Sequence, residues 1–195
     1  CGMRGAPGAI DHVSVEDGKL KLHVIGDGIP TGICGSGLLD LVACLLDLGI
    51  ISKRGRLEKP AKWPDELKET YGVRFVTRNN VSALLLTDDE NGIYLSQKDI
   101  REVQLAKAAI ASGIELLCQE MKVSDTDISQ VLLAGAFGTY LSPKSACRIG
   151  LIPEPLLERI RAIGNAAGEG AKLAACSRTV LEQSQHLAKQ THFVE

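Results

Sequence analysis

Apolar positions along the chain fall into short unbroken runs and longer stretches with helical spacing. The run at 131–133 is apolar throughout and too short for a helix, which predicts a strand buried on both faces. Closely spaced leucines at 38–46 predict a buried helix that ends at Gly49. A long helix is predicted after Ser96, where Asp99 completes a start that resembles a capping box. Its apolar face comprises Ile100, Val103, Ile110, Ile114, Leu117 and Met121.

Glycine, proline and asparagine divide the rest of the chain into shorter elements. The predicted elements are a hairpin around Asp17-Gly18, an exposed basic connection at 53–64, strands at 73–77 and 83–87, a turn at Glu90-Asn91-Gly92, and a short helix that begins at Ser142-Pro143 and stops at Gly150. The basic connection is read as a solvated loop, with contact to an acidic partner as the alternative. Strands and helices in this order indicate an α/β chain.

Three glycine-rich segments lie at the junctions between these elements. One follows the strand at 131–133, a second opens a helix near 164–168, and a third at 31–37 precedes the leucine-rich helix. Glycine lets a ligand approach the backbone, and a helix N-terminus favours an anion by roughly 0.3 to 1 kcal/mol. Each segment alone is also explained by tight packing or by a simple turn. Their order in one chain favours a nucleotide site, although the segments match neither the Walker pattern nor the Rossmann fingerprint.

Four segments resemble the C-terminal region of the reductive activators of corrinoid proteins, over nearly all of the chain. They are CGMRGAPGAI at 1–10, GICGSGLLD at 32–40, QKDIREVQ at 97–104 and LAGAFG at 133–138. The resemblance implies an incomplete lobe of the actin-like (ribonuclease H-like) ATPase fold, with a mixed sheet flanked by helices. It also suggests an inserted lobe at about 31–125 and a core lobe made of 1–30 and 126–195.

The same resemblance implies a binding site for ATP or ADP and suggests its residues. The implied residues are Gly135, Ala136, Phe137 and Gly138 in an adenosine-binding turn; Gly164, Asn165, Ala167 and Gly168 in a later strand-to-helix connection; and Gly32, Gly35 and Ser36 at a glycine-rich helix start. By analogy, Lys98, Arg101 and Glu102 are candidates for contacts to adenine and ribose. The alternative is that these three form a solvated charged face.

Complete members of the family carry an N-terminal ferredoxin-like domain with a [2Fe-2S] cluster, and they use ATP to return cobalt(II) corrinoid to cobalt(I). The Asp-x-Gly-Thr hairpins that hold phosphate and magnesium in the superfamily do not occur here, and Asp27-Gly28 is read as a turn. The start at Cys1 agrees with a piece of a longer protein, which would bind ATP or ADP with Mg. The chain alone is therefore not expected to hydrolyse ATP.

The resemblance implies a corrinoid protein as partner, either a corrinoid iron-sulfur protein or the corrinoid subunit of a methyltransferase. An exposed sheet edge invites pairing with a second copy, so a homodimer is a further expectation. Two alternatives stay open. One is the ATPase activator of a radical 2-hydroxyacyl-CoA dehydratase, and the other is a docking module for a corrinoid or methyltransferase partner without useful nucleotide affinity.

Composition excludes several other classes of function. A net charge of -2 gives no reason to expect nucleic acid binding, and no apolar stretch reaches membrane length, which favours the cytoplasm. Six cysteines without a CxxC motif speak against an iron-sulfur or zinc site within the chain, and most are expected to be buried. The four histidines, at 12, 23, 186 and 192, lack metal-motif spacing and are read as structural or surface residues without acidic partners. Lys144 and Arg148 are expected to face water.

Overall fold

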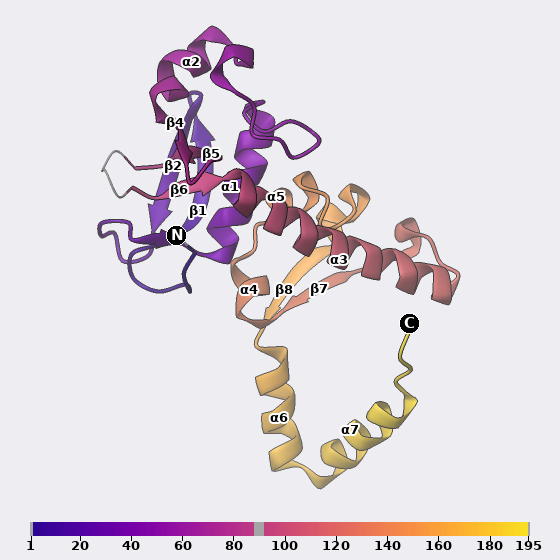
Figure 1. Ribbon diagram of the computed structural model, residues 1–195. Coiled ribbons are helices and arrows are strands. Elements are labelled where there is room, and N and C mark those ends of the chain that lie inside the picture. The colour runs from indigo at the N-terminus through magenta and orange to yellow at the C-terminus, as the bar shows by residue number, and fades with distance from the viewer. Residues whose placement is uncertain (1, 88–91, 195) are drawn as a thin grey trace.

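Three small sheets and the helices around them make up the computed structural model (Figure 1). It describes residues 2–87 and 92–194, apart from the side chains of Ala136 and Phe137. Cys1 and most of the turn predicted at 90–92 therefore lie outside the described residues. Among the described helices, none is both long and apolar enough to cross a membrane.

The first sheet has the strand order β2-β1-β3. Strands β1 (Ala9–Glu16) and β2 (Lys19–Val24) form the predicted hairpin, because Asp17 and Gly18 both adopt positive φ, at 49° and 72°. Strand β3 (Gly32–Ile33) pairs with β1 in parallel, so the sheet is mixed. A register shift between Ile10 and His12 bends β1 near its start.

Helix α1 (Gly35–Asp47) packs directly on β1 and confirms the predicted leucine-rich helix. A Cβ atom added at Gly37 would lie 2.3 Å from the carbonyl oxygen of Ile10, so only glycine permits this approach. The chain leaves the helix at Gly49, whose φ of 74° places it in the left-handed region. Leu41 and Leu45 are completely buried against the sheet.

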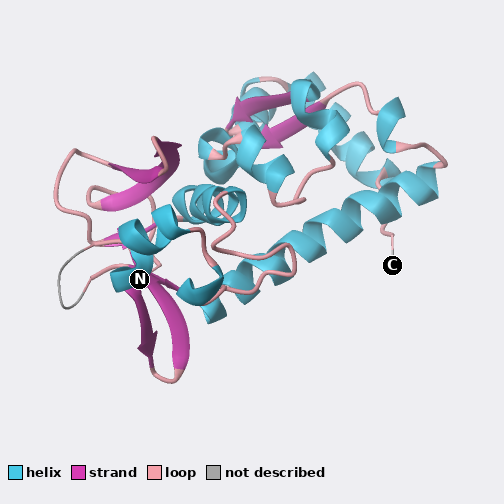
Figure 2. Cartoon of the chain, turned by 90° about the horizontal axis from the view of Figure 1, so that it is seen from above, coloured by secondary structure: helices cyan, strands magenta, loops and turns pink. Residues whose placement is uncertain are grey.

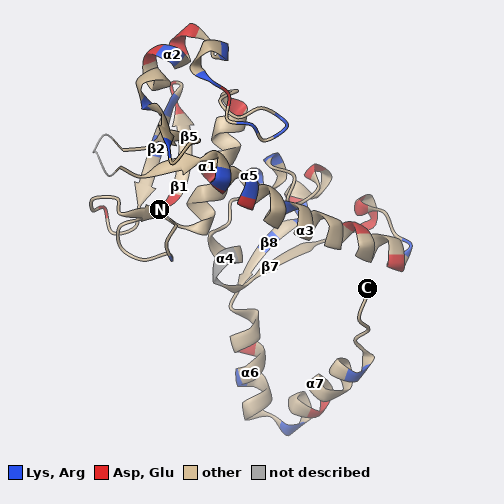
Figure 3. Cartoon of the chain, viewed as in Figure 1, with Lys and Arg blue, Asp and Glu red and all other residues tan. Residues whose placement is uncertain are grey.

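The loop after α1 carries exposed basic side chains, as predicted, and Figure 3 shows lysine and arginine spread over several elements. It ends in a short 3-10 helix, directly followed by the buried Trp63, whose ring packs edge-on to Phe75 of the second sheet at 5.8 Å. The elements here are η1 (Pro60–Lys62), α2 (Asp65–Tyr71), η2 (Gly72–Arg74), β4 (Phe75–Arg78), β5 (Val81–Leu85) and β6 (Tyr94–Ser96). The strands follow one another in the antiparallel order β4-β5-β6.

The predicted long helix is α3 (Gln97–Met121), and Ser96 and Asp99 form the full reciprocal capping box. Its apolar face is buried only near the start, at Ile100 and Val103. Further along, the predicted apolar face is open to solvent, because Met121 is 70% exposed and Ile110 and Leu117 are also exposed. Figure 2 shows the helix running on past the first two sheets, so its second half has little to pack against.

The third sheet consists of the parallel strands β7 (Val131–Ala134) and β8 (Ile160–Gly164). The prediction that 131–133 is buried on both faces is wrong, because Leu132 is 52% exposed. The segment does form a strand, but in a sheet of only two described strands one face of β7 lacks a covering layer. The connecting elements are η3 (Asp125–Asp127), α4 (Gly135–Tyr140), α5 (Pro143–Arg148) and η4 (Glu154–Arg159).

Two C-terminal helices, α6 (Ala166–Cys176) and α7 (Arg178–Gln190), project from the end of β8 (Figure 1). Neither helix contributes a buried residue, and their main packing is against each other. The hydrophobic core lies elsewhere, in a cluster that runs from Ile10 to Ile160 and links the first two sheets to α5 and η4. The boundaries predicted between an inserted lobe and a core lobe lie near positions 30 and 125, and this single core includes residues on both sides of each. The division into two lobes stays a prediction.

Candidate functional site

Two of the three glycine-rich segments leave the third sheet at the same edge. Strands β7 and β8 are parallel, and Ala134 lies opposite Gly164 in their register. Gly135 and Gly164 have φ values of 85° and 64°, which turn the chain into α4 and α6. A Cβ atom added at either position would meet no atom within 4 Å, so open space lies in front of both turns. The structure thus brings together two segments that are almost 30 residues apart.

The helix that follows the second turn begins at a side-chain cap. Asn165 accepts a hydrogen bond of 3.0 Å from the backbone N–H of Gly168, and a Cβ atom on Gly168 would collide with the Asn165 amide. Ala167 and the other small residues of α6 are not buried, so tight packing on a sheet does not account for them. Small side chains instead leave the helix start accessible.

In the turn that follows β7, the second glycine, Gly138, is required for packing. Gly138 is buried in α4, where a Cβ atom would lie 3.0 Å from the backbone carbon of Leu133. The predicted turn is in fact a tight entry into a short helix, with Thr139 donating to the carbonyl oxygen of Gly135 at 2.9 Å. The predicted contributions of the Ala136 and Phe137 side chains lie outside the described residues.

The third glycine-rich segment meets α4 at a cleft of about 390 Å³. Ser36, at the start of α1, and Tyr140, at the end of α4, both line this cleft. The Ser36 hydroxyl donates to the carbonyl oxygen of Asp11 at 2.9 Å, and no side chain caps the start of α1. Gly32 is buried in β3, whereas Gly35 is exposed as the first residue of the helix. The other walls come from Gly5, Ala6, Pro7, Asp11, His23, Ile25, Gly26 and Cys34.

The charged candidates on α3 do not line this cleft. Lys98, Arg101 and Glu102 lie on the exposed side of the first two turns. Their contact to adenine and ribose stays a prediction.

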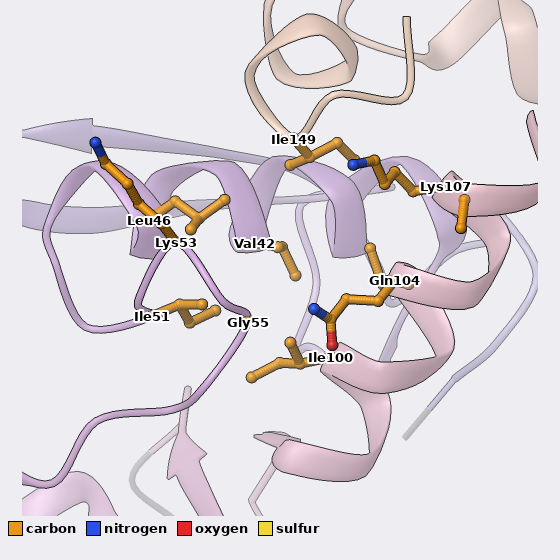
Figure 4. Close-up of a pocket in the computed structure, with 11 residues that line it drawn as sticks. Val42, Leu46, Ile51, Lys53, Gly55, Ile100, Gln104, Lys107 and Ile149 are labelled. Carbon is orange, nitrogen blue, oxygen red and sulfur yellow. The ribbon is translucent and has the colours of Figure 1, made fainter. Parts of the chain in front are cut away.

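The opposite side of α3 borders a separate cavity of about 340 Å³ against α1 and the loop at 53–55 (Figure 4). Val42, Ile51 and Ile100 give this cavity an apolar wall. Gln104 closes one side, because its amide donates to the carbonyl oxygen of Arg54 at 3.2 Å. The cavity therefore belongs to the packing between the basic loop and α3.

Two histidines have acidic partners, which contradicts the expectation from the sequence. His12 Nδ1 lies 3.0 Å from Asp40 Oδ2, and His23 Nδ1 lies 2.5 Å from Asp11 Oδ1. The hydrogen bond to the Asp11 carboxylate raises the pKa of His23. Sequence reasoning missed both pairs because Asp40 comes from α1 and because the bulge in β1 reorients Asp11. The one local sign of an acidic partner was that Asp11 adjoins His12 in the sequence, although Asp11 in fact contacts His23.

Two further expectations about polar groups need correction. Arg148 forms an ion pair with Asp47 at the end of α1 rather than facing water alone, whereas Lys144 is exposed. Most cysteines were expected to be buried, but of the five described only Cys34 and Cys147 are. Within the described part of the chain, no three His, Cys, Asp or Glu side chains gather in a way that could hold a metal ion.

Comparison with known proteins adds three similarities. The family described as the C-terminal domain of RACo, the ASKHA domain, matches residues 1–195. The corrinoid activation enzyme RamQ of Eubacterium limosum is 40% identical over 180 residues, which make up 91% of this chain and 30% of that protein. A solved reductive activator for corrinoid, iron-sulfur protein has a TM-score of 0.84 at 31% identity, covering 99% of this chain and 30% of that one.

The chain thus spans less than one third of the length of each relative. The similarities confirm the predicted α/β actin-like fold, in which mixed sheets are flanked by helices.

Proposed function

The chain belongs to the family of the C-terminal ASKHA domain of RACo, and on this premise we propose that it is the nucleotide-binding part of an ATP-dependent reductive activator. The whole protein would return an inactive cobalt(II) corrinoid protein to cobalt(I). The observation that carries the proposal is the meeting of the glycine turns at Gly135 and Gly164, with open space before both. Names of the relatives support the corrinoid protein as the class of partner.

The residues at these turns fit a nucleotide. Gly135 and Gly164 carry no Cβ atom, which lets a ligand approach the backbone at both turns, and the exposed Ala167 adds little bulk beside them. We assign the adenosine to the segment at 135–138 and the neighbouring contacts to 164–168. Ser36 and the uncapped start of α1 would lie toward the phosphates, because a helix N-terminus attracts negative charge.

The remaining parts of the machinery would come from the rest of the protein. Magnesium would be held by phosphate hairpins outside this chain, and the [2Fe-2S] cluster by an N-terminal ferredoxin-like domain. ATP, when bound with magnesium, supplies the free energy that makes an uphill electron transfer accessible. This chain would contribute a site that binds ATP with different affinity in two conformations of the activator, because equal binding to both shifts no equilibrium. We place this activity in the cytoplasm, a reducing compartment that suits low-potential cobalt chemistry.

The test is a calorimetric titration of ATP and ADP, at matched magnesium, into this chain and into the full-length protein. Binding to both, weaker for the chain alone, is expected if the adenosine site lies here and the phosphate site elsewhere. The variant Gly164→Asn tolerates the left-handed backbone and places its side chain in the open space. It should weaken ATP binding by about tenfold or more, a loss of about 1.4 kcal/mol.

Gly170→Ala is the matched control, since its Cβ atom also meets nothing within 4 Å and lies within α6. Unchanged affinity of the folded Gly164→Asn protein would contradict the assigned site. If neither this chain nor the full-length protein bound nucleotide, the proposal would fail and a docking module for a corrinoid partner would replace it.

A further inference from the structure

Two histidines face each other across the β1–β2 hairpin, outside the glycine turns. His12 and His23 are directly opposite in the antiparallel register, and their ring centroids are 6.2 Å apart. Side chains at opposite positions project from the same face of a sheet. Both rings are partly open to solvent, with side-chain exposures of 45% and 60%.

Each ring is fixed by a carboxylate that is itself buried. Asp40 is 3% exposed and Asp11 is 8% exposed, and each contacts the Nδ1 atom of its histidine. In the neutral ring the proton therefore sits on Nδ1, which leaves the lone pair of Nε2 free to bind. A carboxylate behind an imidazole is the arrangement that orients histidine ligands in metal sites and raises their basicity.

We propose that His12 and His23 form a two-histidine site for a divalent transition-metal ion of the zinc class, with water in the other positions. Metal–nitrogen bonds are about 2.0–2.1 Å long, so two rings that share one ion have centroids roughly 5 to 6 Å apart. The observed centroid distance of 6.2 Å lies close to the upper end of this range. Imidazole nitrogen suits zinc, nickel and copper rather than magnesium.

A buried charge gives independent support for a cation here. Asp40 Oδ1 is fully buried and has no hydrogen-bond partner among the described residues, although Oδ2 contacts His12 and the backbone N–H of Val13. Burying a carboxylate with half of its acceptors unused is costly unless positive charge lies nearby. A metal ion bound to Nε2 of His12 would place positive charge on the far side of the imidazole ring from the Asp40 carboxylate.

The experiment is a calorimetric titration of the tag-free chain with Zn²⁺ alone, without nucleotide. One ion per chain with micromolar affinity is expected. His12→Ala and His23→Ala should each weaken binding at least about tenfold, and Asp11→Asn, which alters only the group behind the ring, by about 10- to 100-fold. His186→Ala is the control, because His186 is an exposed histidine on α7 with an amide rather than an acid as partner.

All proteins carry Cys176→Ser, which removes the exposed thiol as a competing ligand. Circular dichroism confirms that each variant is folded. Equal zinc affinity in the folded His12→Ala protein, or no zinc binding by the parent chain, would overturn the proposal. Neither result depends on nucleotide, so this experiment tests the zinc site independently of the proposed function.

Discussion

Ala134 lies opposite Gly164 in the register of two parallel strands, and this pairing aligns the ends of β7 and β8. The carboxyl ends of parallel strands share one edge of a sheet, where ligands of open α/β sheets characteristically bind. The turn at Gly135 and the turn at Gly164 therefore start from the same place and lead into separate helices. This geometry, more than either glycine motif, gives the proposed nucleotide site its physical basis.

The close approach at Gly138 predicts a stability effect. Gly138→Ala places a methyl group 3.0 Å from the backbone of Leu133, which cannot move as a side chain can. We expect a loss of about 1–3 kcal/mol in the free energy of unfolding, measured with urea. Gly113→Ala, in the middle of α3 with nothing within 4 Å of the added carbon, should instead stabilise the chain by about 0.5–1 kcal/mol. Equal effects of the two substitutions would contradict this account of Gly138.

A second prediction concerns the hydroxyl of Tyr71, which ties α2 to the first hairpin. It accepts a hydrogen bond of 2.7 Å from the backbone N–H of Leu20 and donates to the carbonyl oxygen of Gly18 at 3.3 Å. Tyr71→Phe leaves that N–H without its partner, and we expect a loss of about 1–3 kcal/mol in urea unfolding. Tyr94→Phe serves as control, since the ring beneath Arg78 remains. A neutral Tyr71→Phe substitution would show that water replaces the hydroxyl.

Elements with local signals were predictable from the sequence, and those that depend on neighbours were not. The hairpin at Asp17-Gly18 and the capping box at Ser96 and Asp99 follow from residues a few positions apart, and the structure contains both. The strand at 131–133 was also identified, but apolar periodicity does not tell what covers a strand. Leu132 is exposed because no described element covers its face of the two-stranded sheet.

The candidate site shows the same division. Glycines at 135 and 164 were found from their positions after apolar runs, whereas their shared edge required the pairing of β7 with β8. The carboxylate partners of His12 and His23 were missed because one pair spans 28 residues and the other depends on a bulge. Helix α2 and helix α7 were not identified either. Helix α2 is only seven residues long, and α7, although amphipathic, is mostly polar, so neither stands out as an apolar stretch.

The contact between His23 and Asp11 predicts a pH dependence of stability. A hydrogen bond to Asp11 raises the pKa of His23 above its ordinary value of 6.5, and Asp27 adds a smaller effect in the same direction. Protonated His23 therefore favours the folded state. Its contribution is fully present below pH 6.5 and is lost as the pH rises through the raised pKa.

Urea unfolding across this range should show the loss in the parent chain and a flatter profile for His23→Gln. Identical profiles for the two proteins would mean that the exposed pair contributes nothing measurable. The measurement needs low salt, because screening weakens interactions between exposed charges.

Thiol reactivity provides a further prediction. Cys176 is exposed at the end of α6, whereas partial burial, together with Asp40 and Asp47, raises the pKa of Cys44 to about 11. Because the thiolate is the reactive form, Cys44 should react far more slowly than Cys176 with a thiol reagent at pH 8. Labelling followed by mass spectrometry of peptides measures both rates. In urea the two rates should converge, and a fast Cys44 in the folded chain would contradict the raised pKa of its thiol.

Helix α3 has a mechanical consequence that follows from where it is anchored. Only Ile100 and Val103 are buried, so the 18 residues beyond them extend about 27 Å from the fixed end. A tilt of about 10° at the anchor would displace the tip near Met121 by roughly 5 Å. The helix is thus shaped as a lever whose short arm lies beside α1 and the basic loop. A small shift at those elements would be converted into a large movement at the far end.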